Sequence, residues 1–592
     1  MDEHNIYKGI AASHGIVMGR AYLQDSHMIC AIEHHLKSSE DVSNEVTRFL
    51  DKVEECSNEI AQISNQAKEV LGDETPLILV DAHRQILHDP SMQKKVVRII
   101  EDHKCNAEWA LKILREKYVA KFSKFKDPYF HERLNDIEQA ITKLQRYLSG
   151  EDIGSPLDNL EEPVIVIAHN LTPSDTLKFD RQNIIGFAID SGGKTSHVGI
   201  LASSMDIPAV VGLKNISSII SSGDPIVLDG IRGEIIHKPS KQQFELYNKY
   251  RQRWLYFDED ATAQKDLDAI TTDGIKINVQ ANIETTKDID RLDKYGAGSV
   301  GLFRTEYIFI NDNSWPDEEN QYEQYKKLAT ILKGDNFALV RTLDIGADKL
   351  HASAPYFDDE ANPALGLRAI RFCLQNVDIF KTQIKAILRA AIHGNLKIMF
   401  PLITAVEELI EANKIVELSK SELRAAGKQF KEDIETGVMI ETPSAVILAR
   451  ELSNHCSFFS IGTNDLIQFS MAIDRANEKV AYLYQPLSPA ILRLVASVIK
   501  IANETNTSVS ICGEMAQDPL TVIILLGLGD VKSLSMDVHS IARIKKFIRE
   551  ISISEAQALA TKVINLDNTE EIIRLVKSEV ADYIKDDVSS KI

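Results

Sequence analysis

The segment Gly192–His197, GGKTSH, combines a tight turn with a residue that can carry a phosphoryl group. The apolar run Ile184–Ile189 before it is typical of a buried strand, and the paired glycines allow the chain to turn. Thr195 and Ser196 are favoured N-cap residues, and the N–H groups of a helix N-terminus attract phosphate. His197 follows them, and neutral imidazole, with a reference pKa of about 6.5, is a nucleophile near neutral pH. The segment predicts a phosphoryl-accepting histidine; the alternative is a solvated histidine in a turn.

A second set of candidate residues follows short apolar segments in the second half of the chain. Eight such segments, alternating with helical patterns, are Ile277–Ile283, Val300–Phe303, Ala338–Leu343, Ile398–Phe400, Gly437–Ile440, Phe458–Ile461, Val509–Ile511 and Ser533–Met536. Strand–helix units repeated over roughly 300 residues are typical of a (β/α)8 barrel, whose active site lies at the C-terminal ends of its strands. The residues at those ends are Asn282, Arg304, Arg341, Asp344, Pro401, Glu441, Asn464, Asp465, Cys512 and Glu514.

The chemistry of these side chains suits an anionic substrate and a hard metal ion. Arg304 and Arg341 can bind carboxylate or phosphate with two hydrogen bonds each. Glu441 and Asp465 supply the hard oxygen ligands of a Mg²⁺ site, which usually takes one or two protein carboxylates. Cys512, with a reference pKa of about 8.5, stays mostly protonated and can donate a proton. Further cations that suit the same substrate are Arg368 and Lys349.

Composition limits the class of protein. The chain has 592 residues, a formal net charge of −20 and 44% apolar residues, so several domains with ample cores are expected. The acidic balance argues against nucleic acid or an anionic membrane as the main partner. No run is long and apolar enough to span a bilayer, and the N-terminus lacks the pattern of a signal peptide. The six cysteines form no CxxC pair, so free thiols in a cytoplasmic protein are expected.

The elements that position these residues divide the chain into four parts. Strand-like pieces at 1–30 resume at 150–238 and predict one α/β domain. Between them, residues 31–149 show helical periodicity and predict an inserted bundle of about four long helices. Residues 239–266 predict a helical linker, and 267–592 the barrel. The predicted fold is multidomain α/β: an α/β histidine domain with a helical insert, followed by a (β/α)8 barrel.

Two stretches give the chain a recognisable family resemblance. One is Gly192–His197 with Ile207–Gly212; the other is Phe458–Leu466 with Asp474–Asn477. Supporting motifs are Gly301–Glu306, Arg341–Gly346, Asn362–Arg368, Glu441–Pro443, Tyr484–Pro486 and Cys512–Glu514. In these motifs and their order the chain resembles Enzyme I of the bacterial phosphoenolpyruvate-dependent sugar phosphotransferase system, over essentially its whole length.

The resemblance implies a role for each matching residue. His197 is similar to the histidine that is phosphorylated, in a swivelling domain, and Cys512 to the acid that protonates the enolate of pyruvate. Glu441 and Asp465 are similar to the Mg²⁺ ligands. The implied substrate contacts are Arg304, Arg341, Asn464, Asp465 and Arg475. The resemblance also implies a cytoplasmic homodimer that dimerises through the barrel, with the insert docking the histidine phosphocarrier protein HPr.

Departures from the family pattern leave two alternatives. Val198 and Gly199 follow the histidine where the family usually has a small or hydroxyl residue, and Ser203 stands in place of a usual arginine. They motivate a regulator that binds phosphoenolpyruvate without turnover. In the insert, Glu138-Gln139 stands where Arg-Asp is common, which bears on docking of the phosphocarrier. A phosphoenolpyruvate synthase or pyruvate phosphate dikinase, which needs an ATP-binding domain, is less favoured. The chain has neither the extra length nor a nucleotide motif, since Ala188 breaks the P-loop spacing.

Overall fold

A computed structural model describes most of the chain as two compact units. The described residues are 5–24, 33–71, 86–122, 128–149, 162–171, 183–191, 202, 207–284, 288–310, 315–345, 362–474, 480–580 and 583. The units are Met1–Gln252 and Arg253–Ile592. Three residues with predicted functions, His197, Arg475 and Lys349, lie outside the described part.

An eight-stranded mixed sheet forms one part of the first unit, in the order β1-β8-β7-β3-β4-β5-β6-β2. Its strands are β1 (Ile6–Lys8), β2 (Ile10–Ser13), β3 (Ile16–Gln24), β4 (Val164–Ala168), β5 (Ile184–Ile189), β6 (Ala209–Val211), β7 (Pro225–Asp229) and β8 (Glu234–His237), and a short helix, α8 (Ile216–Ile219), follows β6. The parallel pairs β3–β4, β4–β5 and β5–β6 lie at the centre, so β4 and β5 are apolar throughout. The predicted strand Ile184–Ile189 is confirmed as β5.

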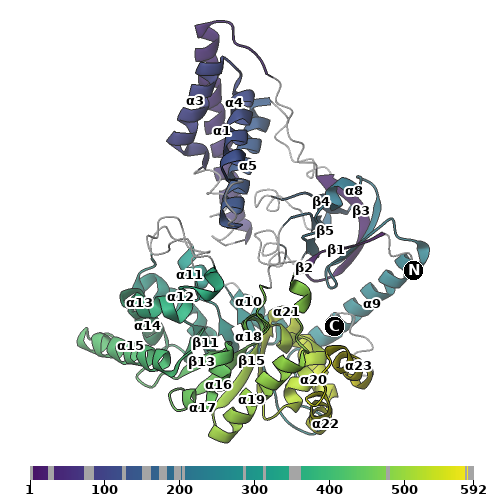
Figure 1. The fold of residues 1–592 in the computed structure, drawn as a ribbon, viewed down its shortest axis with the longest axis vertical. Helices are drawn as coiled ribbons and strands as arrows, with labels where there is room; N and C mark the ends of the chain where they lie inside the picture. Colours follow the sequence, from purple (N-terminus) through teal and green to yellow (C-terminus); the bar gives the residue numbers. More distant parts are fainter. Residues whose placement is uncertain are drawn as a thin grey trace. The chain divides into compact units, whose positions relative to one another are not determined.

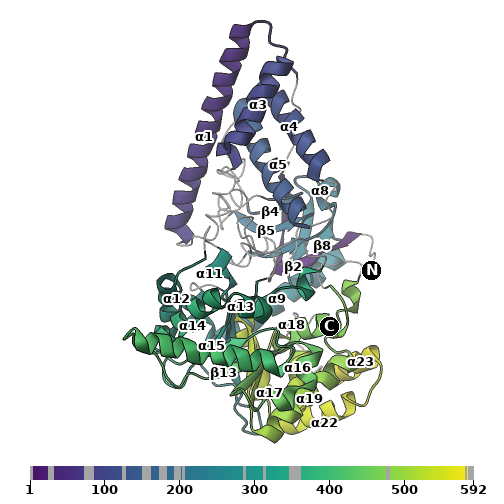
Figure 2. The same ribbon diagram turned by 60° about the vertical axis from the view of Figure 1, so that its left-hand side comes forward.

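A bundle of long helices forms the other part of this unit. Its described helices are α1 (Ser39–Leu71), α3 (Pro90–His103), α4 (Ala107–Phe122) and α5 (Pro128–Ser149), which run side by side in Figures 1 and 2. Their apolar faces share one buried core, which includes Phe49, Val96, Leu111 and Leu144. The predicted helical insert is confirmed.

The second unit contains a closed barrel of eight parallel strands. The strands are β9 (Asn278–Ile283), β10 (Val300–Phe303), β11 (Ala338–Arg341), β12 (Leu396–Phe400), β13 (Thr436–Ile440), β14 (Phe458–Gly462), β15 (Ser508–Cys512) and β16 (Ser533–Asp537). Each predicted strand overlaps one observed strand, and β10 has the predicted limits. The predicted combination of an α/β domain, a helical insert and a (β/α)8 barrel is therefore confirmed.

Helices surround the barrel and share one large core with its outer face (Figure 1). They are α10 (Asp288–Tyr295), α11 (Glu306–Ile310), α12 (Glu318–Ile331), α13 (Ala369–Gln375), α14 (Val377–Ala390), α15 (Val406–Ala425), α16 (Pro443–Ile447), α17 (Ala449–Leu452), α18 (Thr463–Ser470), α19 (Pro489–Thr505), α20 (Pro519–Gly527), α21 (Val538–Glu550), α22 (Ile553–Val563) and α23 (Thr569–Val580). Short 3₁₀ helices are η3 (Pro363–Leu365), η4 (Ala481–Leu483) and η5 (Glu514–Gln517). Among the described helices, none has the length and apolar character that crossing a membrane requires.

One long helix, α9 (Lys241–Ala263), covers most of the predicted linker 239–266, and the division between the two units falls within it. The four predicted domain ranges themselves remain predictions. Five cysteines of the described part are free thiols, as expected.

Candidate active site

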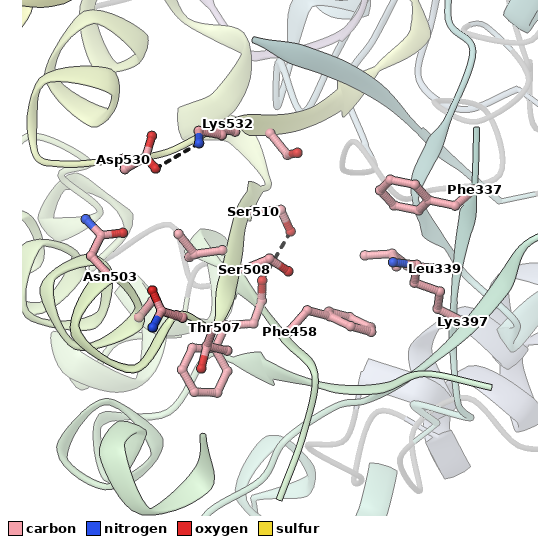
Figure 3. A pocket seen from close by; sticks show the side chains of 15 residues that line it. Phe337, Leu339, Lys397, Phe458, Asn503, Thr507, Ser508, Ser510, Asp530 and Lys532 are labelled. Atoms are coloured by element: carbon pink, nitrogen blue, oxygen red, sulfur yellow. Dashed lines mark hydrogen bonds and ion pairs between the residues drawn. The ribbon is translucent and has the colours of Figure 1, made fainter. Parts of the chain in front are cut away.

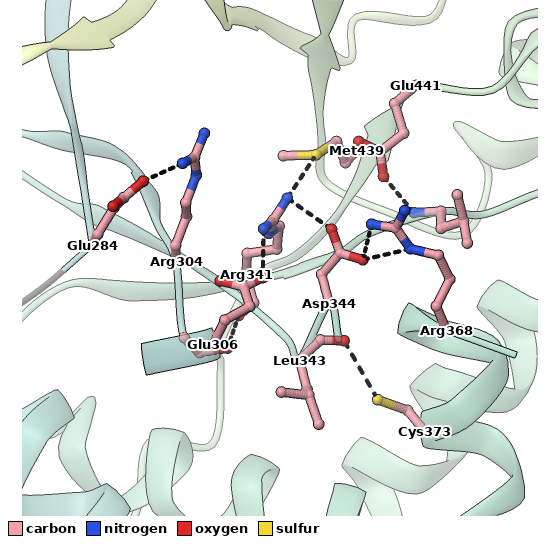
Figure 4. A network of polar contacts seen from close by, with 12 residues as sticks. Glu284, Arg304, Glu306, Arg341, Leu343, Asp344, Arg368, Cys373, Met439 and Glu441 are labelled. Carbon is pink, nitrogen blue, oxygen red and sulfur yellow. Dashed lines mark hydrogen bonds and ion pairs between the residues drawn. The ribbon is translucent and has the colours of Figure 1, made fainter. Parts of the chain in front are cut away.

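Arg341 lies at the centre of a buried network at the C-terminal end of the barrel (Figure 4). Its guanidinium forms an ion pair with Glu306, at the start of α11, and lies 3.0 Å (Nη1 to Oδ2) from Asp344. Arg368 binds the other oxygen of Asp344 at 2.8 Å. Burial disfavours the charged form of Arg341, but Glu306 and Asp344 raise its pKa. The network therefore holds a permanent cation in a fixed orientation.

Arg304 follows β10 and provides a second cation. It forms an ion pair with Glu284, a residue that follows β9. Burial and the nearby Glu284 carboxylate raise the pKa of Tyr307, so its hydroxyl remains a hydrogen-bond donor. Arg304 and Arg341 thus stand on neighbouring strands, each oriented by a carboxylate, as a pair that suits a phosphate or carboxylate ligand.

Two carboxylates at the ends of β13 and β14 suit a divalent cation. Glu441 is buried and accepts a hydrogen bond from the backbone N–H of Leu402 at 2.6 Å, while Asp465 is half-buried in the first turn of α18. Burial, followed by the negative charges of Asp465 and Asp344, raises the pKa of Glu441. A divalent cation would relieve this repulsion, so the two side chains fit a Mg²⁺ site that substrate and water oxygens complete. The described residues contain no cluster of three or more His, Cys, Asp or Glu with metal-binding geometry.

Asn464 is held in place by the loop that follows β15. Its Oδ1 accepts hydrogen bonds from the backbone N–H of Glu514 at 2.9 Å and from the hydroxyl of Tyr484 at 3.3 Å. Gly513, between Cys512 and Glu514, has φ +107°, and a Cβ there would lie 2.8 Å from Oδ1 of Asn464. The close approach of this loop requires glycine at position 513.

Cys512 ends β15 and lies in the interior of the barrel. Its Sγ is 3.4 Å from the hydroxyl of Ser460, which donates to it, and 3.4 Å from the carbonyl oxygen of Ile461. Burial raises the pKa of the thiol to about 11, although the bond from Ser460 opposes this. The thiol is therefore protonated at neutral pH and is available as an acid.

The start of the GGKTSH segment is anchored in the first unit. Asp190 follows β5, is buried, and accepts a hydrogen bond from the backbone N–H of Ser217 at 3.0 Å. Its carboxylate also lies 3.2 Å from Nδ1 of His169, an exposed side chain that follows β4. His197, seven residues beyond Asp190, lies outside the described residues.

The structure thus brings together most of the predicted barrel residues and adds others. The predicted residues Arg304, Arg341, Glu441, Asn464, Asp465 and Cys512 all stand at the C-terminal ends of strands or directly after them. Four further residues, for which the sequence predicted no role, each contact one of these side chains: Glu284, Glu306, Tyr484 and Ser460. Glu306, Ser460 and Tyr484 lie inside the motifs that carry the family resemblance, and this was the one signal in the sequence that could have pointed to them.

Three family models match the chain in succession. The N-terminal domain of the PEP-utilising enzymes matches residues 8–133, their mobile domain matches 160–233, and their PEP-binding domain matches 258–553. The last match contains the whole polar network at the end of the barrel, and the second contains His169, Asp190 and His197.

Curated relatives match almost the full chain. The chain is 39% identical over 577 residues to phosphoenolpyruvate-protein phosphotransferase of Listeria monocytogenes, which covers 97% of this chain and 99% of that protein. It is 40% identical to the protein of the same name from Mycoplasma capricolum, with 96% and 98% covered. The Bacillus subtilis protein of that name is 39% identical, with 96% and 99% covered.

Proposed function

The chain belongs to the phosphoenolpyruvate-protein phosphotransferase family, and on this premise we propose that it transfers the phosphoryl group of phosphoenolpyruvate to His197 and then to a histidine of HPr. Pyruvate is the second product, and the reaction is the first general step of the sugar phosphotransferase system. The observation that carries the proposal is the buried network around Arg341, which faces two carboxylates and one thiol at the same end of the barrel.

The barrel binds phosphoenolpyruvate. Arg304 and Arg341 neutralise the phosphate and carboxylate of the substrate, and their carboxylate partners keep the guanidinium groups preorganised. Asn464 donates through its amide nitrogen, since its oxygen is already bound to the loop after β15. Arg475 would add a further contact. Glu441 and Asp465 would hold Mg²⁺, which supplies charge neutralisation at the transferring phosphoryl group when bound.

Cys512 donates the proton that converts the enolate, at its C3 atom, into pyruvate. When the phosphoryl group leaves, the enolate of pyruvate remains, and C3 must receive a proton. The buried thiol keeps its proton at neutral pH because burial raises its pKa to about 11. The thiol S–H bond breaks, the C–H bond of the methyl group forms, and pyruvate is released.

His197 accepts the phosphoryl group and carries it to the partner. The anchoring of Asp190 by Ser217 supports a defined exit point for the segment that carries this histidine. Because His197 and the barrel residues belong to different units, we expect a movement about the predicted linker during each cycle. A regulator that binds phosphoenolpyruvate without turnover is not favoured, because the barrel has each polar residue to which the family resemblance gives a role.

The partner surface and the homodimer belong to the same proposal. The helical insert would dock HPr, and Glu138, which lies 3.7 Å from Arg115, stands on α5 of that bundle. The barrel would form a homodimer. Strongly exposed apolar residues after β11, β13 and β14 support this, namely Leu365, Ile447 and Tyr482. A cytoplasmic location fits the free thiols.

Labelling with radioactive phosphoenolpyruvate and Mg²⁺ tests the proposal. We expect one acid-labile, base-stable phosphoryl group in the wild type, which passes to purified HPr from the same organism. His197→Ala should take up no label. His103→Ala, which removes an exposed histidine at the end of α3, is the matched control and should label normally. Absence of label from the wild type, with phosphoenolpyruvate still bound, would favour the regulator instead.

A further inference from the structure

The interior of the barrel has an apolar side and a polar side. The apolar side consists of Leu302, Leu339, Met399, Met439 and Phe458, packed against Cys512. Most other inward positions of β14, β15, β16 and β9 carry hydroxyls and amides, namely Ser460, Ser508, Ser510, Ser533, Ser535, Asn278, Gln280 and Asn282. Branched apolar side chains usually fill such a barrel. A continuous polar stripe therefore runs along its inner wall.

A cavity opens into this stripe from the end of the barrel opposite the active site. Figure 3 shows the side chains that line it. Its volume is about 410 Å³, and residues at the starts of several strands line it. Ser508 at its mouth is exposed, and Ser510, further in, is 8% exposed. Phe337 and Phe458 form another part of the wall, with the Lys397 ammonium 4.7 Å from the Phe337 ring. The cavity is wide enough for several water molecules and has polar groups to bind them.

Ser460 lies between Ser510, which lines the cavity, and the thiol of Cys512. Residues Ser460 and Ser510 lie directly opposite one another in the pairing of β14 with β15, and Gly462 lies opposite Cys512. Strands in a sheet are about 4.8 Å apart, so one water can bridge the two hydroxyls. The Ser510 hydroxyl donates to the carbonyl oxygen of Phe459 at 3.3 Å, so it would accept from this water. Ser460 is fully buried and donates to Sγ of Cys512 at 3.4 Å, which leaves its lone pairs able to accept.

Gln280 gives independent support for water at this depth. It is fully buried on β9, pairs with Ser535, and Ser535 pairs in turn with Cys512. Neither its amide nitrogen nor its amide oxygen has a hydrogen-bond partner among the described residues. Buried groups of this kind are usually satisfied by internal water.

We infer that Ser460 and a water held by Ser510 form a proton path through which water of this cavity reprotonates Cys512 after each turnover. The inference rests on the proposed function, in which Cys512 gives its proton to C3 of the enolate and becomes a thiolate. The O–H proton of Ser460 passes to sulfur, and the Ser460 oxygen takes a proton from the water between it and Ser510. The hydroxide left behind equilibrates with bulk water through the cavity. The product, pyruvate, thus need not leave before the thiol of Cys512 regains its proton.

A double-mixing isotope experiment measures this path. Full-length protein in H₂O is diluted into excess D₂O and aged for a variable delay. Phosphoenolpyruvate and Mg²⁺ are then added for a single turnover, and mass spectrometry reads the deuterium at C3 of pyruvate. The rise of deuterium with delay gives the exchange rate of the thiol. We expect Ser460→Ala and Ser510→Val to slow this exchange about tenfold or more, because the first removes the hydroxyl that transfers the proton and the second removes the hydroxyl that holds the water.

Matched variants distinguish the effect of losing a hydroxyl from the effect of altered packing. Ser510→Thr has nearly the volume of Ser510→Val but keeps the hydroxyl, so it should exchange near the wild-type rate. Ser508→Ala, at the exposed mouth, should also exchange normally. Equal exchange rates in wild type, Ser460→Ala and Ser510→Val would overturn the path and show that protons arrive from the substrate side. In Cys512→Ala, the deuterium at C3 of pyruvate should not depend on the delay. If it depended on the delay as in the wild type, Cys512 would not be the proton donor, and the proposed function would be contradicted.

Discussion

At the scale of single residues, the candidate site depends on charges that compensate one another. Arg341 is 9% exposed and forms ion pairs with two carboxylates, Glu306 and Asp344, of which the second also binds Arg368. Removing one member of such a buried group leaves its partners charged and unpaired, which is more costly than loss of an exposed ion pair.

Arg341→Met should therefore destabilise the barrel and abolish binding of phosphoenolpyruvate. We expect a loss of roughly 3–5 kcal/mol in the free energy of unfolding of the barrel, measured by denaturant titration of its transition. The control is Arg450→Met, which removes an exposed pair with Glu504 and should cost at most about 1 kcal/mol. Equal losses in the two variants would contradict a buried, compensated role for Arg341.

The raised pKa of Cys512 predicts how the rate of pyruvate formation depends on pH. Because burial raises its pKa to about 11, the protonated form, which is the acid, persists below that pH and is lost as the pH rises through it. An ordinary thiol would lose its proton near pH 8.5, as an order-of-magnitude reference. The thiol-dependent part of pyruvate formation, taken as wild type minus Cys512→Ala, should thus show no decline between about pH 8 and 9. Cys512→Ala should form pyruvate at least about 100-fold more slowly. A wild-type rate in this variant would remove Cys512 as the proton donor.

At the scale of elements, strand ends and the loops after them set the positions of the site residues. Gly513 shows this most directly, because a Cβ at this position would lie 2.4 Å from Oγ1 of Thr463 and 2.8 Å from Oδ1 of Asn464. The turn after β15 can approach α18 only without a side chain.

Gly513→Ala should displace Asn464 and raise the KM for phosphoenolpyruvate by about tenfold, which corresponds to about 1.4 kcal/mol. Gly427→Ala is a matched control, since Gly427 also has a positive φ, +67°, but a Cβ there meets nothing within 4 Å. Both variants carry the backbone strain of a positive φ, but steady-state kinetics should change in Gly513→Ala alone. An unchanged KM in Gly513→Ala would mean that Asn464 does not contact the substrate.

The strands of the barrel and most polar residues that follow them could be predicted from the sequence. The barrel strands are short apolar runs between helical patterns, and buried parallel strands need such runs, so all eight were found. The polar residues after them could be identified because parallel strands share one C-terminal edge. The pairings of Arg304 with Glu284 and of Ser460 with Cys512 could not, because they depend on which neighbouring strands meet and at what register. For Glu306, membership of a motif gave no indication that it would bind Arg341.

At the scale of the whole molecule, the reaction is divided between two units. The proposed carrier His197 belongs to Met1–Gln252, and the proposed substrate residues belong to Arg253–Ile592. The two halves of the chemistry should therefore be separable.

Residues 253–592 expressed alone should bind phosphoenolpyruvate with Mg²⁺ and form no acid-labile phosphoprotein. Calorimetry measures the binding, and labelling with radioactive phosphoenolpyruvate shows whether an acid-labile phosphoprotein forms. Chelation of Mg²⁺ should weaken binding by tenfold or more, because the phosphate then loses the cation that neutralises its charge, as an order-of-magnitude expectation. Acid-labile labelling of the isolated barrel unit would place the acceptor histidine elsewhere.

The central claim is reversible transfer of a phosphoryl group from phosphoenolpyruvate to His197. Isotope exchange tests it most directly and needs no partner protein: labelled pyruvate is incubated with unlabelled phosphoenolpyruvate, Mg²⁺ and the full-length protein. Reversible formation of the phosphohistidine predicts that label enters phosphoenolpyruvate with the wild type and with His103→Ala, but not with His197→Ala. Exchange at the wild-type rate in His197→Ala would contradict the claim.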